Sequence, residues 1–166
     1  MELKKHFEFR YLFWCVYFLL FAIYIIIGLR PVNAANYDID GHLAIPEINL
    51  STDVASLALQ NNRLDTPDEI AGSYSESLNK TLLIGHSTTV FKDLHNLSLN
   101  DTLEYDGKTY IIKRIETVAK SNVRMSMLLR EAPVDTIVLM TCAGELLGNG
   151  DATHRLIITA IDIQST

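Results

Sequence analysis

Cysteine is scarce in this chain, which has 166 residues and only two cysteines, Cys15 and Cys142. Cys15 lies in a long apolar run near the N-terminus and Cys142 lies far from it, so the sequence argues against a structural disulfide within the chain. The isolated Cys142 has two interpretations. It is either a small buried hydrophobe, which is common for cysteine, or a thiol that carries chemistry.

Positive charge is also scarce beyond the first thirty residues. Those thirty hold four of the 14 Lys and Arg but only two of the 20 Asp and Glu, which leaves 10 positive against 18 negative side chains, net −8. Nucleic-acid binding relies on neutralising phosphates, so the acidic remainder is a poor candidate for a nucleic-acid-binding domain. The sequence has no internal repeat and no low-complexity segment, and its length suits one domain plus an N-terminal segment.

An uncharged, apolar run covers residues 11–29. At about 1.5 Å per residue, a helix of this length crosses a hydrocarbon core of about 30 Å, so we predict a single membrane-spanning helix that acts as a signal anchor. A cleaved signal peptide is the alternative, because residues 32–34, Val-Asn-Ala, are similar to a small-residue cleavage site. The apolar core of such peptides is shorter, about 7 to 15 residues.

Basic residues flank this run mainly on its N-terminal side. Lys4, Lys5 and Arg10 precede it, and only Arg30 follows closely. Positively charged flanks tend to stay in the cytoplasm, so we expect residues 1–10 there and the remainder outside. The chain would then be a single-pass protein of the cell membrane with an extracytoplasmic domain.

Short strands dominate the predicted domain. Residues 30–42 are small, polar and turn-prone and predict a linker, so the domain covers residues 43–166. Apolar or alternating runs bounded by turn residues predict strands over residues 43–48, 54–59, 81–84, 101–105, 110–118, 136–141 and 155–163. Asp106-Gly107 predicts a tight hairpin between two of them.

Helices are predicted to be few and short. Residues 61–77 are polar and predict a loop with room for one helical turn, residues 90–94 predict another turn, and residues 122–131 predict a short helix that ends before Pro133. Seven or eight strands with few helices predict a mainly β domain. Propensity alone does not separate a closed or partly closed barrel from a sandwich.

Two apolar runs near the C-terminus bring a thiol and a guanidinium together. The first run, residues 136–142, ends in Cys142. The second run, residues 154–160, has Arg155 as its second residue, and a glycine-containing segment separates the two runs. As neighbouring strands, they let Cys142 and Arg155 face each other. A thiol that attacks a carbonyl and a cation that stabilises the developing oxyanion suit acyl transfer. A base is still needed, and His86, after an apolar run and Gly85, is a candidate.

Four segments, in this order, resemble the sortases, the membrane-anchored cysteine transpeptidases of bacteria. They are Ile45-Pro46-Glu47-Ile48, Gly85-His86 after a strand, Leu139-Met140-Thr141-Cys142 at the end of a later strand, and Arg155 at the start of the last long strand. The resemblance covers about residues 41–161. It implies an eight-stranded β-barrel with short helices, preceded by the transmembrane helix, in which the His, the Cys and the Arg converge on one face.

The resemblance also implies a role for each residue. Cys142 would be the nucleophile, His86 the general acid and base, and Arg155 the group that stabilises the oxyanion or holds the substrate backbone. Thr141 would support the nucleophile or line the substrate groove.

Alternatives stay open for two of these residues. His86 could be a loop or packing histidine. Arg155 could be a surface arginine paired with an acid such as Glu145 or Asp151.

No metal or other cofactor is expected. His86, Cys142 and His154 are of residue types that bind zinc and offer one conceivable three-ligand set, but their spacing fits no strong zinc motif. His154 also stands in a segment, residues 153–156, that resembles the last-strand motif of some pilin-polymerising sortases. The calcium site of some sortases has no predicted position here, with Glu104 and Glu116 as the available acids.

By resemblance, the chain would cleave a C-terminal sorting signal similar to Leu-Pro-x-Thr-Gly in exported proteins and hold the acyl group as a thioester on Cys142. It would then transfer that group to an amine of a cell-wall peptide or to a pilin lysine. Two other functions stay open: a cysteine peptidase with water as acceptor, and a non-catalytic, membrane-tethered binding barrel.

The sortase subclass is not assigned. The loop between Cys142 and Arg155 is short and lacks the aromatic and proline residues that pilin-type sortases place after the Cys. No Asp-Pro-aromatic lid motif precedes Ile45.

Overall fold

The computed structural model describes residues 37–60, 63–148 and 151–165. The predicted cytoplasmic segment 1–10, the predicted membrane-spanning helix 11–29 and the first part of the predicted linker 30–42 lie outside the described residues. Within the ranges that are described, no helix is long and apolar enough to span a membrane.

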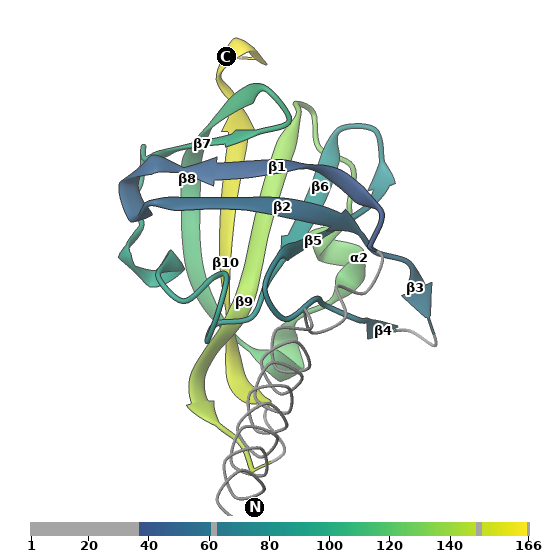
Figure 1. Ribbon diagram of the computed structural model, residues 1–166, viewed down its shortest axis with the longest axis vertical. Coiled ribbons are helices and arrows are strands. Elements are labelled where there is room, and N and C mark those ends of the chain that lie inside the picture. Colours follow the sequence, from purple (N-terminus) through teal and green to yellow (C-terminus); the bar gives the residue numbers. More distant parts are fainter. Residues whose placement is uncertain (1–36, 61–62, 149–150, 166) are drawn as a thin grey trace, which may run out of the picture. The chain divides into compact units, whose positions relative to one another are not determined.

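Eight strands close into a barrel in the order β1-β2-β5-β6-β9-β10-β8-β7 (Figure 1). Their bounds are β1 Ile39–Ile45, β2 Leu50–Ser56, β5 Ala71–Ser77, β6 Lys80–Ile84, β7 Thr102–Tyr105, β8 Lys108–Ala119, β9 Thr136–Leu146 and β10 Ala152–Asp162. Two short strands, β3 (Leu59–Gln60) and β4 (Arg63–Leu64), form a separate two-stranded sheet. The predicted eight-stranded β-barrel is therefore confirmed.

Helical structure in the described residues is short, as predicted. It consists of one α-helical turn, α2 (Met125–Leu128), and the 3-10 turns η1 (Pro46–Ile48), η2 (Leu94–Asn96), η3 (Lys120–Asn122) and η4 (Ile163–Ser165). α2 is shorter than the predicted helix over residues 122–131, and the predicted turn over 90–94 appears as hydrogen-bonded turns that lead into η2.

β9 lies between β6 and β10 and pairs with β6 over its first half and with β10 along most of its length. β6 runs parallel to it, from Lys80 opposite Thr136 to Ile84 opposite Met140. β10 runs antiparallel to it. The end of β6 and the start of β10 therefore meet at the same part of β9.

The apolar run of β9 is buried on both faces of the sheet. Ile137 and Leu139 belong to the main core of the barrel. Val138 packs in a second cluster with Leu128 of α2 and Ile157 of β10. A strand that is covered on both faces has apolar residues on both sides, so its sequence is a continuous apolar run and apolar and polar residues do not alternate in it.

The β7–β8 hairpin turns at the predicted dipeptide. Asp106 and Gly107 both have positive φ angles, 48° and 76°. Two left-handed residues in a two-residue loop match the right-handed twist of the flanking strands. This prediction is confirmed.

The predicted loop over residues 61–77 is wrong, because it contains β4 and the whole of β5. The buried residues of β5 are Ala71, Gly72 and Ser73, which are small or polar and give no apolar signal. Small residues are required there, because the side chain of Leu57 fills the space that a Cβ on Gly72 would occupy.

Several strand boundaries also differ from those predicted. β1 runs from Ile39 to Ile45, so residues 46–48 of the predicted strand over 43–48 form η1 instead. The predicted strand over 54–59 ends at Ser56. β2 begins at Leu50, before the predicted start at residue 54. β9 continues past Cys142 to Leu146. Cys142 is therefore held within a paired strand and does not end it, because Ala143 and Leu146 after it still pair with β10.

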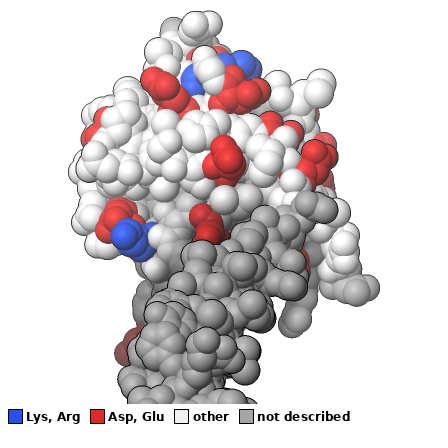
Figure 2. All heavy atoms as spheres, viewed as in Figure 1, with Lys and Arg blue, Asp and Glu red and all other residues white. Residues whose placement is uncertain are grey.

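Acidic side chains are the commoner charged groups on the face that carries β1 and β2 (Figure 2). Lys and Arg gather at only a few points of that face. The surface in view is thus consistent with the acidic composition of the domain.

Gly85 is expected to tolerate no larger residue. A Cβ at this buried position would lie 2.6 Å from Phe91 Cδ2 and 2.6 Å from Val90 Cγ1. Gly85→Ala should therefore lower the free energy of unfolding by about 1–3 kcal/mol through overpacking. Gly148→Ala, where a Cβ meets nothing within 4 Å, should change it by about 0.5 kcal/mol or less. Urea unfolding of the two variants checks this, and equal midpoints would contradict it.

Candidate active site

Cys142 and Arg155 lie directly opposite each other on β9 and β10. Residues opposite each other in an antiparallel pair project from the same face of the sheet, with Cβ atoms about 5 Å apart. Cys142 is a free, partly buried thiol. The predicted pairing of thiol and guanidinium across neighbouring strands is therefore present.

His86 reaches the same place from the other side of β9. Gly85 N–H donates to the carbonyl of Met140 at 3.3 Å, and the Thr141 hydroxyl donates to the carbonyl of Gly85 at 2.7 Å. These two bonds extend the β6–β9 pairing beyond Ile84. His86 follows immediately and is thereby held beside the Thr141-Cys142 segment.

All four predicted site residues line one cavity of about 370 Å³. Its polar wall holds His86, Thr141, Cys142 and Arg155, together with Thr66 and Lys120. Its apolar wall is made by Leu59, Leu64, Ile84, Met125 and Met140. Leu59 and Leu64 are paired residues of the β3–β4 hairpin, so this small sheet forms one side of the cavity.

The imidazole of His86 is held through Nε2. This nitrogen lies 3.3 Å from the carbonyl oxygen of Thr66 and 3.8 Å from Asp68 Oδ1, whose side chain is 95% exposed. A carbonyl only accepts hydrogen bonds, so Nε2 carries the proton, and Nδ1 has the free lone pair when the ring is neutral. The exposed Asp68 contributes little, because solvent screens such a pair.

The guanidinium of Arg155 is held by one carboxylate and two carbonyls. Nη2 donates to Asp151 Oδ1 at 2.7 Å, and Nη1 donates to the carbonyls of Ala152 at 3.1 Å and His154 at 2.9 Å. The ion pair with Asp151 was the alternative interpretation of Arg155. The ion pair is present, and the paired Arg155 also lines the cavity with Cys142.

Asp151 binds a second cation of the cavity wall, Lys120, through its other carboxylate oxygen. Hydrogen bonds from Lys120, from Arg155 and from the backbone N–H of Ala152 hold the pKa of Asp151 well below its usual range. Asp151 is therefore ionised throughout the neutral pH range.

His154 does not join the cavity residues. It is adjacent to Arg155 in β10, so its side chain projects from the opposite face. Its Nδ1 is 2.8 Å from Thr153 Oγ1. The described residues, which include His86, Cys142 and His154, contain no group of three His, Cys, Asp or Glu side chains placed to share a metal ion. His86, Cys142 and His154 are therefore not placed to share one metal ion.

The family model of the sortase domain matches residues 43–162. The chain belongs to the sortase family. The resemblance drawn from the sequence is thereby confirmed. No curated protein matches the chain in sequence.

Solved structures of sortases share the fold of this sortase. Sortase A from Corynebacterium diphtheriae has a TM-score of 0.59 and 19% identity, over 78% of this chain and 63% of that one. The pilus-related sortase C of Group B Streptococcus has a TM-score of 0.58 and 20% identity, over 78% of this chain and 69% of that one. Sortase C1 from Streptococcus suis has a TM-score of 0.55 and 21% identity, over 76% of this chain and 74% of that one.

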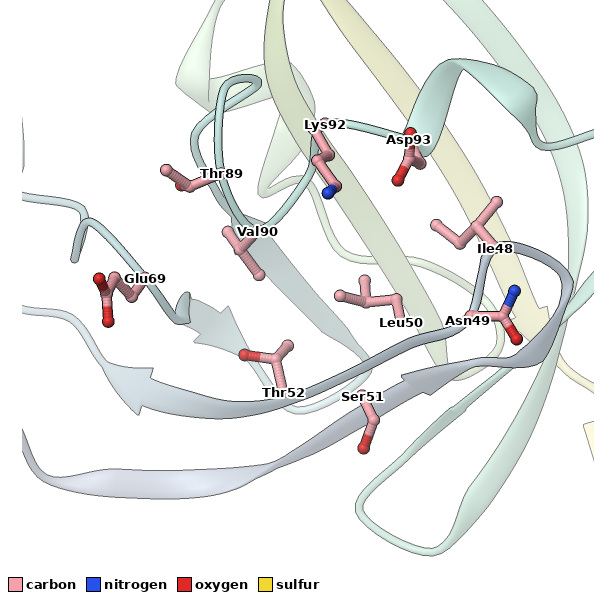
Figure 3. A pocket seen from close by; sticks show the side chains of 10 residues that line it. All are labelled: Ile48, Asn49, Leu50, Ser51, Thr52, Glu69, Thr89, Val90, Lys92 and Asp93. Atoms are coloured by element: carbon pink, nitrogen blue, oxygen red, sulfur yellow. The ribbon is translucent and has the colours of Figure 1, made fainter.

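A second groove of this sortase, of about 340 Å³, is lined in part by the loop that follows His86 (Figure 3). Thr89, Val90, Lys92 and Asp93 of that loop face Leu50 across it. It contains neither a thiol nor an imidazole. The catalytic candidates thus belong to the first cavity.

A hydrogen-bonded Ser51, His42 and Asp53 also lie outside the first cavity. His42 Nε2 is 3.0 Å from Ser51 Oγ and Nδ1 is 3.2 Å from Asp53 Oδ1. Ser51 points away from Leu50 and Thr52 in Figure 3. The side chains of His42 and Asp53 are more than half exposed, 53% and 62%, so water competes for these bonds and the trio serves as a cross-strand polar contact between β1 and β2.

The other residues that line the cavity were not predicted as site residues, among them Thr66, Lys120 and the β3–β4 residues Leu59 and Leu64. Thr66 acts through its backbone carbonyl, which no side-chain pattern reveals. Glu104 and Glu116, the two acids named as available for a calcium site, lie on β7 and β8, and Glu116 pairs with Arg114 at 2.7 Å.

The Thr141 hydroxyl is expected to stabilise the junction that holds His86. Thr141→Val keeps the shape but leaves the buried Gly85 carbonyl without its donor, and should cost about 1–3 kcal/mol of unfolding free energy. Thr141→Ser keeps the hydroxyl and loses one methyl group, and should cost about 0.8 kcal/mol. Urea denaturation of the three proteins checks the order, and a Val variant at least as stable as the Ser variant would contradict it.

Proposed function

We propose that this sortase is a cysteine transpeptidase that cleaves a sorting signal similar to Leu-Pro-x-Thr-Gly in exported proteins and transfers the product to an amine. The observation that carries the proposal is the single cavity that contains Cys142, His86 and Arg155. Cysteine transpeptidation is the general activity of the family. The chain spans 63% of the length of the Corynebacterium sortase A, so the substrate and the acceptor are proposed from the chemistry of the site.

The first half-reaction forms a thioester. Cys142 passes its thiol proton to His86, and the resulting thiolate attacks the carbonyl carbon of the signal Thr. The oxygen that gains the negative charge accepts hydrogen bonds from Arg155. His86 then gives its proton to the departing amine of the next residue as the peptide bond breaks. The acyl group stays on Cys142.

The second half-reaction transfers the acyl group to an amine of a cell-wall peptide or a pilin lysine. The amine attacks the thioester carbonyl, loses a proton to His86, and releases the sulfur of Cys142. Only side chains of the chain take part, so we propose that the reaction needs no cofactor.

The apolar wall of the cavity supports a signal with apolar residues before the scissile bond. Leu59, Leu64, Ile84, Met125 and Met140 offer a surface on which Leu and Pro side chains lose contact with water. Thr141 lines the same cavity and is the proposed polar contact for the substrate.

We further propose that residues 11–29 anchor the chain in the cell membrane, with residues 1–10 in the cytoplasm and the barrel outside. Exported substrates with their own anchors would then share one surface with the enzyme, and this confinement raises their effective concentration.

Cys142→Ala is expected to abolish the reaction, because no other thiol lies in the domain. Intact-mass spectrometry of the wild type with a signal peptide should show a covalent adduct that disappears when an amine is added, with formation of the peptide–amine product. The alanine variant should show neither species. Hydrolysis at a rate unaffected by amine would identify a cysteine peptidase, and rescue of a deletion phenotype by the alanine variant would identify a binding barrel.

The pH dependence of the rate is expected to identify the base. A bell-shaped profile of kcat/KM arises when the reaction needs one group deprotonated and another protonated, here the thiolate of Cys142 and the protonated His86. His86→Ala should lose this shape together with at least about a hundredfold in rate. His154→Ala is the matched control, because this histidine lies on the opposite face of β10. Loss of the bell in the His154 variant alone would mean that the base is wrongly assigned.

A further inference from the structure

Asp151 and Arg155 form an unusually shielded ion pair for this protein. Their side chains are 22% and 15% exposed. In every other Lys or Arg ion pair of the described residues, the cation is at least half exposed. Shielding from water strengthens the hydrogen bond and keeps the two side chains in one geometry.

The backbone is irregular where this pair forms. Residues four apart in an extended strand lie about 13 Å apart, at about 3.3 Å per residue. The register of β10 against β9 shifts between Ala152 and His154, which marks a bulge-like irregularity. Bulges redirect side chains and occur beside active sites. Here the irregularity precedes Arg155 directly and accompanies the 2.7 Å contact with Asp151.

The contacts of Arg155 leave part of the guanidinium available. An arginine has five N–H donors. Nη1 donates to two carbonyls and Nη2 donates once to Asp151. The Nε–H and the second N–H of Nη2 have no acceptor among the described residues. Two donors therefore remain for oxygen atoms of a bound peptide.

From this geometry we propose that Asp151 is a positioning residue, which fixes the guanidinium of Arg155 beside Cys142 and leaves two N–H groups for the substrate carbonyl and its oxyanion. The inference rests on the proposed function only for the last step, the use of Arg155 in acyl transfer. Asp151 acts through Arg155 and does not touch the substrate.

Charge balance in the cavity gives Asp151 a second effect. Lys120 and Arg155 both line the cavity, and the single carboxylate of Asp151 binds both of them. Without Asp151, the two cations repel each other and both long side chains regain rotational freedom. The guanidinium would then be spread over several positions near Cys142.

The test uses the full chain in mild detergent and single-turnover acylation of Cys142 by a Leu-Pro-x-Thr-Gly peptide. Asp151→Asn should lower the acylation rate by about ten- to a hundredfold, with a smaller change in the peptide concentration for half-maximal rate. In an Arg155→Ala background the same substitution should change the rate less than about twofold, because the residue through which it acts is gone. Asp151→Glu should recover part of the rate.

Asp135→Asn is the matched control. Asp135 is also a shielded carboxylate, 24% exposed and 2.7 Å from Lys108 Nζ, and it does not line the active-site cavity. Its acylation rate should equal that of the wild type. The thermal midpoints of all variants show whether a slower variant is also less stable. A variant that is slower but has an unchanged midpoint has lost the position of Arg155 and not the fold. The proposal would be overturned if Asp151→Asn lowered the acylation rate by the same factor with Arg155 present and with Arg155 replaced by Ala. It would also be overturned if the Asp151→Asn variant reacted as fast as the wild type or faster.

A readout without substrate separates this inference from the proposed function. In side-chain ¹⁵N spectra of the wild type, the guanidinium of Arg155 should show slow rotation, and Asp151→Asn should make it fast. Absence of any acylation in the wild type would sink the proposed function, while unchanged guanidinium spectra in Asp151→Asn would sink the positioning by Asp151.

Discussion

The pairing of β9 with β6 on one side and β10 on the other is the constraint on which the candidate site depends. The parallel pairing ends at Ile84 opposite Met140, which brings His86 to the region of Cys142. The antiparallel pairing sets Arg155 opposite Cys142. Backbone hydrogen bonds between strands thus determine where the thiol and the guanidinium lie, and side chains on paired strands are held more accurately than side chains on loops. The imidazole follows the end of β6 and is held by the bonds between Gly85 and the Met140-Thr141 segment.

Burial of β9 on both faces makes this constraint rigid. Leu139 is fully buried in the barrel core, and Val138 packs under α2. Closely packed interiors deform little, so a shift of β9 relative to its neighbours would disturb two clusters at once. The site lies at Cys142, which is partly exposed and follows the buried part of β9. The nucleophile is therefore accessible while its backbone stays fixed.

The sequence predicted the parts of the fold that carry strong patterns. The apolar runs of β6, β9 and β10 and the Asp106-Gly107 turn were all identified. The closed barrel was predicted from the resemblance of four segments to the sortases. β5 was missed because its buried residues are small or polar, so its pairing with β2 and β6 is decided by tertiary contacts. Cys142, His86 and Arg155 were named because they end or begin apolar runs. Thr66 and Lys120 were not, because a backbone carbonyl and a residue of a short 3-10 turn leave no pattern in the sequence.

The two interpretations of Arg155, as an ion-paired residue and as a residue of the site, are compatible because an arginine has more donors than one carboxylate can accept. The cavity wall holds two cations and its Asp151 supplies one negative charge. The cavity is thus locally positive at this point, in a domain whose surface is acidic. A site that is to stabilise a developing oxyanion needs this sign of potential, and it needs the charge fixed before the reaction begins. The ion pair beside the proposed nucleophile meets both requirements. Asp151 offsets one of the two positive charges of Lys120 and Arg155, so one net positive charge remains, and its hydrogen bonds hold the guanidinium in place.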